Sequence, residues 1–110
     1  MSVFASILIV DDEKNTRDGL HQFLEGLDYD VLTAADGLEG WKVFKEEKPQ
    51  IVLADIRMPG MEGTALLEKI KAESPRTPVI LLTAYGSVED AVKAMKNGAF
   101  YYLTKPVNLE

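Results

Sequence analysis

The chain has 110 residues, of which 46% are hydrophobic, and this length suits one compact domain with one core. Its net charge of -6 at pH 7 opposes contact with a phosphate backbone or an anionic membrane, so we expect neither nucleic acid nor membrane as a partner of this segment. Because the sequence has no cysteine, no signal peptide pattern and no apolar stretch near the roughly 20 residues that span a bilayer, we expect a soluble, cytoplasmic domain.

Short apolar runs alternate along the chain with segments of helical period. The runs are strand-sized and mostly free of polar residues, as in strands covered on both faces. Strands are expected at residues 7–10, 31–34, 51–54, 79–82 and 100–103. Between them, helices are expected around Leu20, Phe23, Leu24 and Leu27, around Leu38, Trp41 and Phe44, around Leu66, Leu67 and Ile70, and around Val88, Ala91, Val92 and Met95. We expect the aromatic side chains of these helices in the core.

Residues that begin and end helices support this division of the chain. Ser87 and Asp90 have the spacing of a capping box that opens the fourth helix, and Gly98 stands where a left-handed residue would close it. Pro75 and Pro78 prevent the third helix from continuing into the fourth strand.

The regular alternation of strand and helix predicts an α/β fold. Right-handed crossovers place helices on both faces of a parallel, doubly wound sheet. We expect five strands in the flavodoxin-like order 2-1-3-4-5, with ligands bound at the carboxyl ends of the strands. The residues just beyond each apolar run are therefore the candidates for function.

Four of the five runs are followed by residues with useful chemistry. Asp11, Asp12 and Glu13 follow the first, Asp55 the third, Thr83 the fourth, and Lys105 comes shortly after the fifth. The second run has nothing comparable, and its strand is expected at the sheet edge, away from the crevice. An alternative role for Asp11 and Asp12 is only to stabilise the start of the first helix through its dipole. We interpret Glu13 in this second way.

Carboxylates gathered in one crevice predict a divalent cation. At about 4 Å and an effective dielectric near 20, each close pair of carboxylates costs about 4 kcal/mol. Mg²⁺ removes this repulsion and prefers such oxygen ligands. With a lysine and a threonine hydroxyl nearby, the group suits a phosphoryl moiety, and Asp55 is then the natural nucleophile for an aspartyl phosphate.

The stretches "ILIVDDE", "VLADIRMPGMEG", "VILLTAYGS" and "YYLTKP" resemble the signatures of receiver domains, the CheY-like family of bacterial two-component response regulators. This resemblance implies that Asp55 accepts a phosphoryl group from a phosphohistidine of a sensor histidine kinase. It implies Mg²⁺ as the cofactor, bound directly by Asp12, largely through water by Asp11, and by Asp55 and the main-chain carbonyl of Arg57.

The resemblance also implies a switch. Thr83 and Lys105 would hold phosphoryl oxygens, and movement of Thr83 would let Tyr102 turn inward and change the surface of the fourth helix and fifth strand. The stretches "LTAYGS" and "GAFYYLTKP" are most similar to receivers attached to enhancer-binding transcription activators, so a transcriptional output domain is expected. Tyr101 stands where relatives often have an acidic residue, and the "FYY" run is expected to enlarge an apolar contact surface.

Receiver domains have a fifth helix after the "KP" motif, whereas this chain ends at "VNLE". We therefore expect residues 1–110 to be one receiver domain, truncated before that helix and belonging to a longer protein with a C-terminal output domain. With one face of the sheet uncovered, the segment is expected to pair as a homodimer or to be only marginally stable.

Three other functions are weighed against the receiver. An aspartyl phosphate enzyme would need a second Asp two residues after Asp55, where Arg57 stands, so we do not expect an enzyme. A flavodoxin-like redox protein would need a phosphate-binding loop after the first strand, where "DDE" would repel FMN. A pseudo-receiver that only binds a partner remains the alternative, although every residue for phosphorylation is present.

Overall fold

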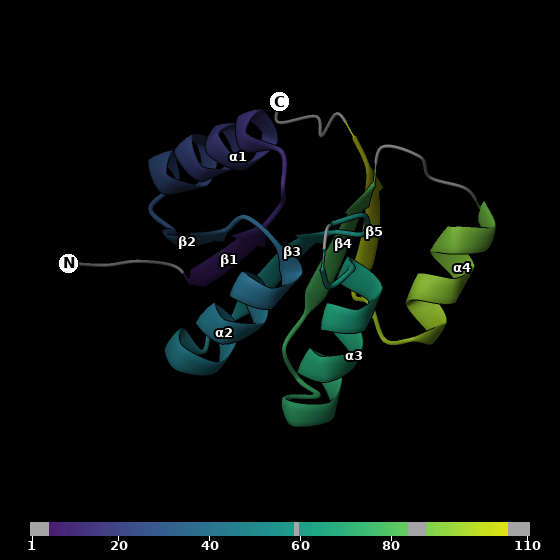
Figure 1. The fold of residues 1–110 in the computed structure, drawn as a ribbon. Helices are drawn as coiled ribbons and strands as arrows, with labels where there is room; N and C mark the ends of the chain where they lie inside the picture. Colours follow the sequence, from purple (N-terminus) through teal and green to yellow (C-terminus); the bar gives the residue numbers. More distant parts are fainter. Residues whose placement is uncertain (1–4, 59, 84–87, 106–110) are drawn as a thin grey trace.

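The computed structural model describes residues 5–58, 60–83 and 88–105, and Figure 1 shows their arrangement. The strands pair in parallel in the order β2-β1-β3-β4-β5, which confirms the predicted fold class. Along the chain the elements are β1 (Ser6–Val10), α1 (Lys14–Gly26), β2 (Asp30–Ala34), α2 (Gly37–Glu47), β3 (Ile51–Asp55), α3 (Gly63–Glu73), β4 (Val79–Thr83), α4 (Val88–Lys96) and β5 (Tyr101–Thr104).

Side chains alternate between the two faces of the sheet, and each face has its own core. Leu8 and Val10 of β1 point to the side of α2, α3 and α4, where they pack with Leu66 and other buried residues. Ile7 and Ile9 point to the opposite side, where α1 contributes Leu20. Figure 1 shows α1 on one side of the sheet and α2 and α3 on the other. The inner strands β1, β3 and β4 are mostly buried, which agrees with their nearly continuous apolar sequences, whereas the edge strands β2 and β5 are more exposed.

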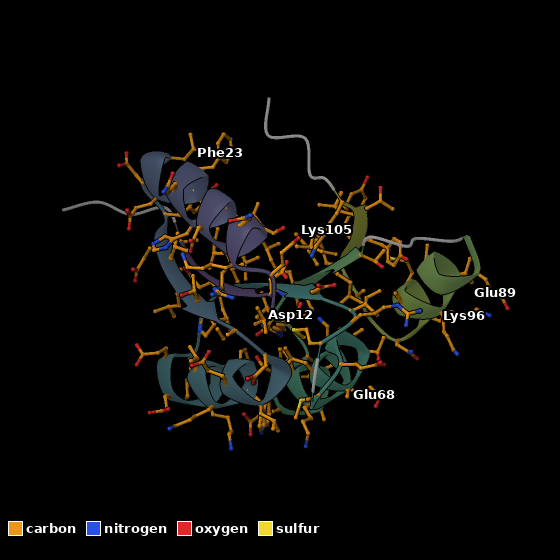
Figure 2. The ribbon with its side chains drawn as sticks, turned by 45° about the horizontal axis from the view of Figure 1, so that its top comes forward. Asp12, Phe23, Glu68, Glu89, Lys96 and Lys105 are labelled. Carbon is orange, nitrogen blue, oxygen red and sulfur yellow. The ribbon has the colours of Figure 1, made fainter. Side chains whose placement is uncertain are left out.

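The aromatic side chains of the helices do not all lie in the core. Phe44 is 4% exposed, as predicted, and Trp41 packs against the core from its edge. The prediction for Phe23 is wrong, because this side chain is 38% exposed on α1. In the described part of the chain α1 is the only helix on its face of the sheet, so no neighbouring helix covers the outer side chains (Figure 2).

The ends of the elements agree with most of the sequence signals. Gly98 has φ +99° after the end of α4, the left-handed conformation predicted for this position. The fifth strand begins at Tyr101 rather than at residue 100, and Phe100 is 65% exposed. The predicted capping box falls on Ser87, which lies outside the described residues. None of the described helices is long and apolar enough to cross a bilayer.

Candidate functional site

The carboxyl ends of β1 and β3 bring the predicted acidic residues together. Val10 pairs with Ala54, so the residues that follow, Asp11 and Asp55, stand next to each other at the strand ends. A hydrogen bond of 3.1 Å from the Asp11 main-chain nitrogen to the carbonyl of Ala34 extends the pairing with β2. Carboxylate oxygens of Asp11, Asp12 and Asp55 all lie within 4.8 Å of one another.

Lys105 completes this cluster from just beyond β5. Its Nζ atom lies 2.9 Å from Asp11 Oδ2 and 3.0 Å from Asp55 Oδ2, and the latter contact is a hydrogen bond. Glu13 Oε1 is farther from Nζ, at 3.6 Å. The Lys105 main-chain nitrogen donates to the carbonyl of Thr83 at 2.7 Å, which fixes the lysine to the end of β4. Figure 2 shows Lys105 after β5 and Asp12 after β1, both in the middle of the view.

Burial and neighbouring charges shift the pKa values of Asp55 and Lys105. Burial is the main cause that raises the pKa of Asp55 above its usual value, and the charge of Asp11 adds to it, while Lys105 acts in the opposite direction. Burial on its own would lower the pKa of the Lys105 ammonium, but contacts with Asp11 and Asp55 outweigh burial and raise it. Lys105 therefore stays charged, whereas the Asp55 carboxylate costs free energy in the absence of a further cation.

Asp11 is the most enclosed member of the cluster. Its side chain is fully buried, and Oδ1 accepts a hydrogen bond of 2.9 Å from the main-chain nitrogen of Glu13. Oδ2 is buried and is reached by the charge of Lys105, but no hydrogen bond of good geometry reaches it from the described residues. Among the described residues, the Lys105 ammonium is therefore the cation that reaches this buried oxygen, at 2.9 Å.

These donors fit a hard divalent cation. Asp11, Asp12 and Asp55 offer only oxygen atoms, which Mg²⁺ prefers, and one buried oxygen among them lacks a hydrogen bond. The exposed side chain of Asp12 leaves room for water in the coordination shell. The residues therefore fit Mg²⁺ by their chemistry.

The main chain of Arg57 also faces the site. Its N–H donates to Asp55 Oδ1 at 3.3 Å, and its side chain is exposed. That the Arg57 carbonyl binds the cation remains a prediction. The loop after β3 then turns into α3, where the N–H of Gly63 donates to the carbonyl of Ile56 at 2.8 Å.

The two predicted switch residues lie beside the cluster. Thr83 is 2% exposed at the end of β4, where it pairs in register with Thr104 of β5. It lines a cavity of about 210 Å³ together with residues of the β3–α3 loop and of α4, including Arg57 and Lys93. Tyr102 is half-buried in β5 and packs against the core. Their movement on phosphorylation remains a prediction.

Sequence reasoning missed two contacts at this site. Glu13 was interpreted only as favouring the helix start, and it does precede α1, but its carboxylate also faces Lys105. Arg17 was not singled out, yet its Nη1 atom donates to the carbonyl of Asp11 at 2.7 Å. A basic residue in the first turn, where the helix dipole disfavours a cation, does not single out Arg17, because Lys14 lies in the same turn.

A model of the response regulator receiver domain family matches residues 7–110, and the chain belongs to this family. The transcriptional regulatory protein GlrR of Escherichia coli (strain K12) is 43% identical over 104 residues, which are 94% of this chain and 23% of that protein. The chain thus spans about a quarter of the length of such curated relatives.

Two solved structures show the same fold. A CheY-like receiver domain protein from Methanospirillum hungatei JF-1 has a TM-score of 0.91 and 41% identity, with 98% of this chain and 86% of that chain covered. A chain of the CheX-CheY-BeF3-Mg+2 complex from Borrelia burgdorferi has a TM-score of 0.92 and 30% identity, with 97% of this chain and 82% of that chain covered.

Adding Mg²⁺ is expected to stabilise the folded protein. A ligand at about 100 times its Kd that binds only the folded state adds about 2.7 kcal/mol to the free energy of unfolding. Urea unfolding with MgCl₂, compared with NaCl at equal ionic strength, measures this gain. Asp12→Asn removes one ligand charge and is expected to reduce the gain. An equal midpoint in both salts for the wild type would contradict the proposed cation site.

Without Mg²⁺, Asp55→Asn is expected to raise the free energy of unfolding at pH 7. The folded protein holds the Asp55 proton more tightly than the unfolded chain, so ionisation of Asp55 destabilises the fold above its folded pKa. The advantage of the variant should therefore shrink as the pH falls toward the ordinary Asp value of 3.8, where both states become protonated. Urea unfolding over this pH range in EDTA measures the difference. A stability difference between Asp55→Asn and the wild type that grows as the pH falls would contradict a raised pKa of Asp55.

Proposed function

We propose that Asp55 accepts a phosphoryl group from a phosphohistidine of a sensor histidine kinase, and that this receiver domain thereby works as a phosphorylation-dependent signalling switch. The observation that carries the proposal is the placement of Asp55 against Asp11, Asp12 and Lys105 in one cluster. The closeness of a carboxylate that can attack phosphorus, two further carboxylates that suit a cation and the charge of Lys105 supports this proposal.

Asp55 acts as the nucleophile in this transfer. One carboxylate oxygen forms a bond to phosphorus while the P–N bond of the phosphohistidine breaks, and the imidazole leaves with the electron pair of that bond. Lys105 contacts Asp55, and this contact supports the proposal that it would hold a phosphoryl oxygen after transfer. Bound Mg²⁺ would supply the positive charge that offsets the carboxylates and the phosphoryl oxygens.

The phosphoryl group then favours a second arrangement of the domain. It adds about -1.5 to -2 charges and new acceptor oxygens, which Thr83 and Lys105 would contact. The inward turn of Tyr102 follows the movement of Thr83 and changes the surface of α4 and β5. Val92, Met95 and Tyr101 are about half exposed on this surface, which supports a role in binding another domain. The change is a population shift between two arrangements.

The signal is proposed to control a C-terminal output domain, with residues 1–110 as the receiver domain of the longer protein. This chain matches only 23% of GlrR, which supports a longer protein with a further domain. GlrR is named a transcriptional regulatory protein, which supports a transcriptional output for that domain. Phosphoryl transfer to Asp55 needs the sensor histidine kinase as the partner protein and Mg²⁺ as the cofactor. A homodimer is part of the same proposal.

The test uses the full-length protein with acetyl phosphate as the phosphodonor. Intact mass spectrometry after incubation with Mg²⁺ is expected to show one added phosphoryl group that alkali removes. The same incubation in EDTA is expected to show little adduct, because the carboxylates then repel the incoming anion. An adduct that resists alkali, or one that forms equally in EDTA, would contradict the proposed chemistry.

A further inference from the structure

Arg17 links the first turn of α1 to the strand end that carries the acidic cluster. Its Nη1 atom donates a part-buried hydrogen bond of 2.7 Å to the main-chain carbonyl of Asp11. This carbonyl belongs to the peptide group that joins Asp11 to Asp12. Because a peptide group is planar, a bond that fixes the carbonyl also fixes the direction in which the chain enters Asp12.

The position of Arg17 is unfavourable for the helix alone. A cation in the first turn opposes the positive end of the helix dipole. The first turn of α1 contains no acidic residue, and the residue that precedes it, Glu13, makes no side-chain cap. Lys14 lies in the same turn but points to solvent, whereas the Arg17 guanidinium reaches back to the Asp11 carbonyl and so offsets part of this unfavourable interaction.

Asp12 depends on the main chain for its orientation. Its side chain is exposed, and no hydrogen bond holds it among the residues that the structure describes. Asp11, in contrast, is fixed by burial, by the N–H of Glu13 and by Lys105. The carbonyl of Asp11 is thus the point through which Arg17 can orient the exposed ligand.

We propose that Arg17 is a positioning residue of the cation site: its guanidinium fixes the peptide between Asp11 and Asp12 and so preorganises the two carboxylates for Mg²⁺. This inference rests on the proposed function, in which the cluster binds that cation. Groups that orient metal ligands without touching the metal commonly change its affinity by about 10-fold to 100-fold when they are removed.

The direction of the change in Mg²⁺ affinity distinguishes a positioning role of Arg17 from a purely electrostatic one. Removing any positive charge near the cluster should strengthen the binding of a cation, because it removes repulsion. Loss of positioning should weaken it. Lys14 is the matched control, because it lies in the same turn of α1 with a side chain that is 76% exposed and paired with Asp18.

The experiment is isothermal titration of Mg²⁺ into the full-length protein and its variants. Arg17→Met is expected to raise the Kd about 10-fold, whereas Lys14→Met leaves it unchanged or lowers it. Arg17→Lys keeps the charge and one donor and is expected to restore part of the affinity. Circular dichroism and urea unfolding without Mg²⁺ report whether each variant is folded. If Arg17→Met is unfolded, Arg17→Lys is compared with the wild type in its place. The Kd of Arg17→Lys for Mg²⁺ is expected to exceed that of the wild type.

Each other outcome overturns the inference. An Arg17→Met protein that is less stable but binds Mg²⁺ as the wild type does would show a structural role only. Tighter binding in both methionine variants would show a role of charge alone. If the wild type itself binds no Mg²⁺, the proposed cation site fails together with this inference, and this result is distinct from the first two.

Discussion

Replacing Asp55 by asparagine is expected to abolish the alkali-labile phosphoryl adduct completely. The amide has nearly the same shape as the carboxylate, but it lacks the negatively charged oxygen that attacks phosphorus. Its amide oxygen can still accept a hydrogen bond from Lys105, so the surroundings need not rearrange. Intact mass spectrometry with Mg²⁺ and acetyl phosphate measures the result against the wild type.

A matched control for this variant is Asp28→Asn. Asp28 is exposed between α1 and β2 and has φ 71°, a conformation that asparagine adopts as readily as aspartate. The same chemical change is made there far from the carboxyl ends of the strands. Asp28→Asn is therefore expected to be labelled like the wild type. Equal labelling of Asp55→Asn and Asp28→Asn would show that the phosphoryl group is attached elsewhere.

Replacing Gly63 by alanine is expected to lower the free energy of unfolding by about 3 kcal/mol. A Cβ atom at this position would lie 2.2 Å from the carbonyl oxygen of Asp55 and 2.9 Å from the Cα of Ile56. Both contacts are with main chain, so no flexible side chain can move aside. The start of α3 or the end of β3 must shift, and the shift reaches the backbone of Asp55 itself.

The control for this variant is Gly19→Ala in α1. A Cβ atom there meets nothing within 4 Å, and the residue is exposed. Alanine is favoured over glycine in a helix by about 0.5 to 1 kcal/mol, so this variant should be slightly more stable than the wild type. Urea unfolding of the two variants measures both effects. A Gly63→Ala protein as stable as Gly19→Ala would mean that β3 and α3 are not packed as closely as described.

The convergence of the acidic residues could be predicted because it depends on topology. Parallel strands end at the same edge of a sheet, so Asp11 and Asp55 had to meet once β1 and β3 were recognised as neighbours. Lys105 follows from the same reasoning through β5. Short apolar runs sufficed to predict the strands, and the three inner strands β1, β3 and β4 are mostly buried.

Contacts that depend on side-chain reach could not be predicted in the same way. The spacing of Glu13 and Lys105 along the chain says nothing of the 3.6 Å between their charged atoms. The bond from Arg17 to the Asp11 carbonyl depends on the rotamer of a long side chain. Phe23 was misplaced because helical period identifies the apolar face of α1 but not how much of that face a neighbour covers.

The most direct test of the central claim locates the phosphoryl group itself. After incubation with Mg²⁺ and acetyl phosphate, borohydride reduces an acyl phosphate to an alcohol, and peptide mass mapping identifies the reduced residue. We expect the mass change only in the peptide with Asp55, and at that residue. Reduction at Asp11, Asp12 or Glu13, or no reduced residue in protein that carries the adduct, would contradict the assignment of Asp55 as the acceptor.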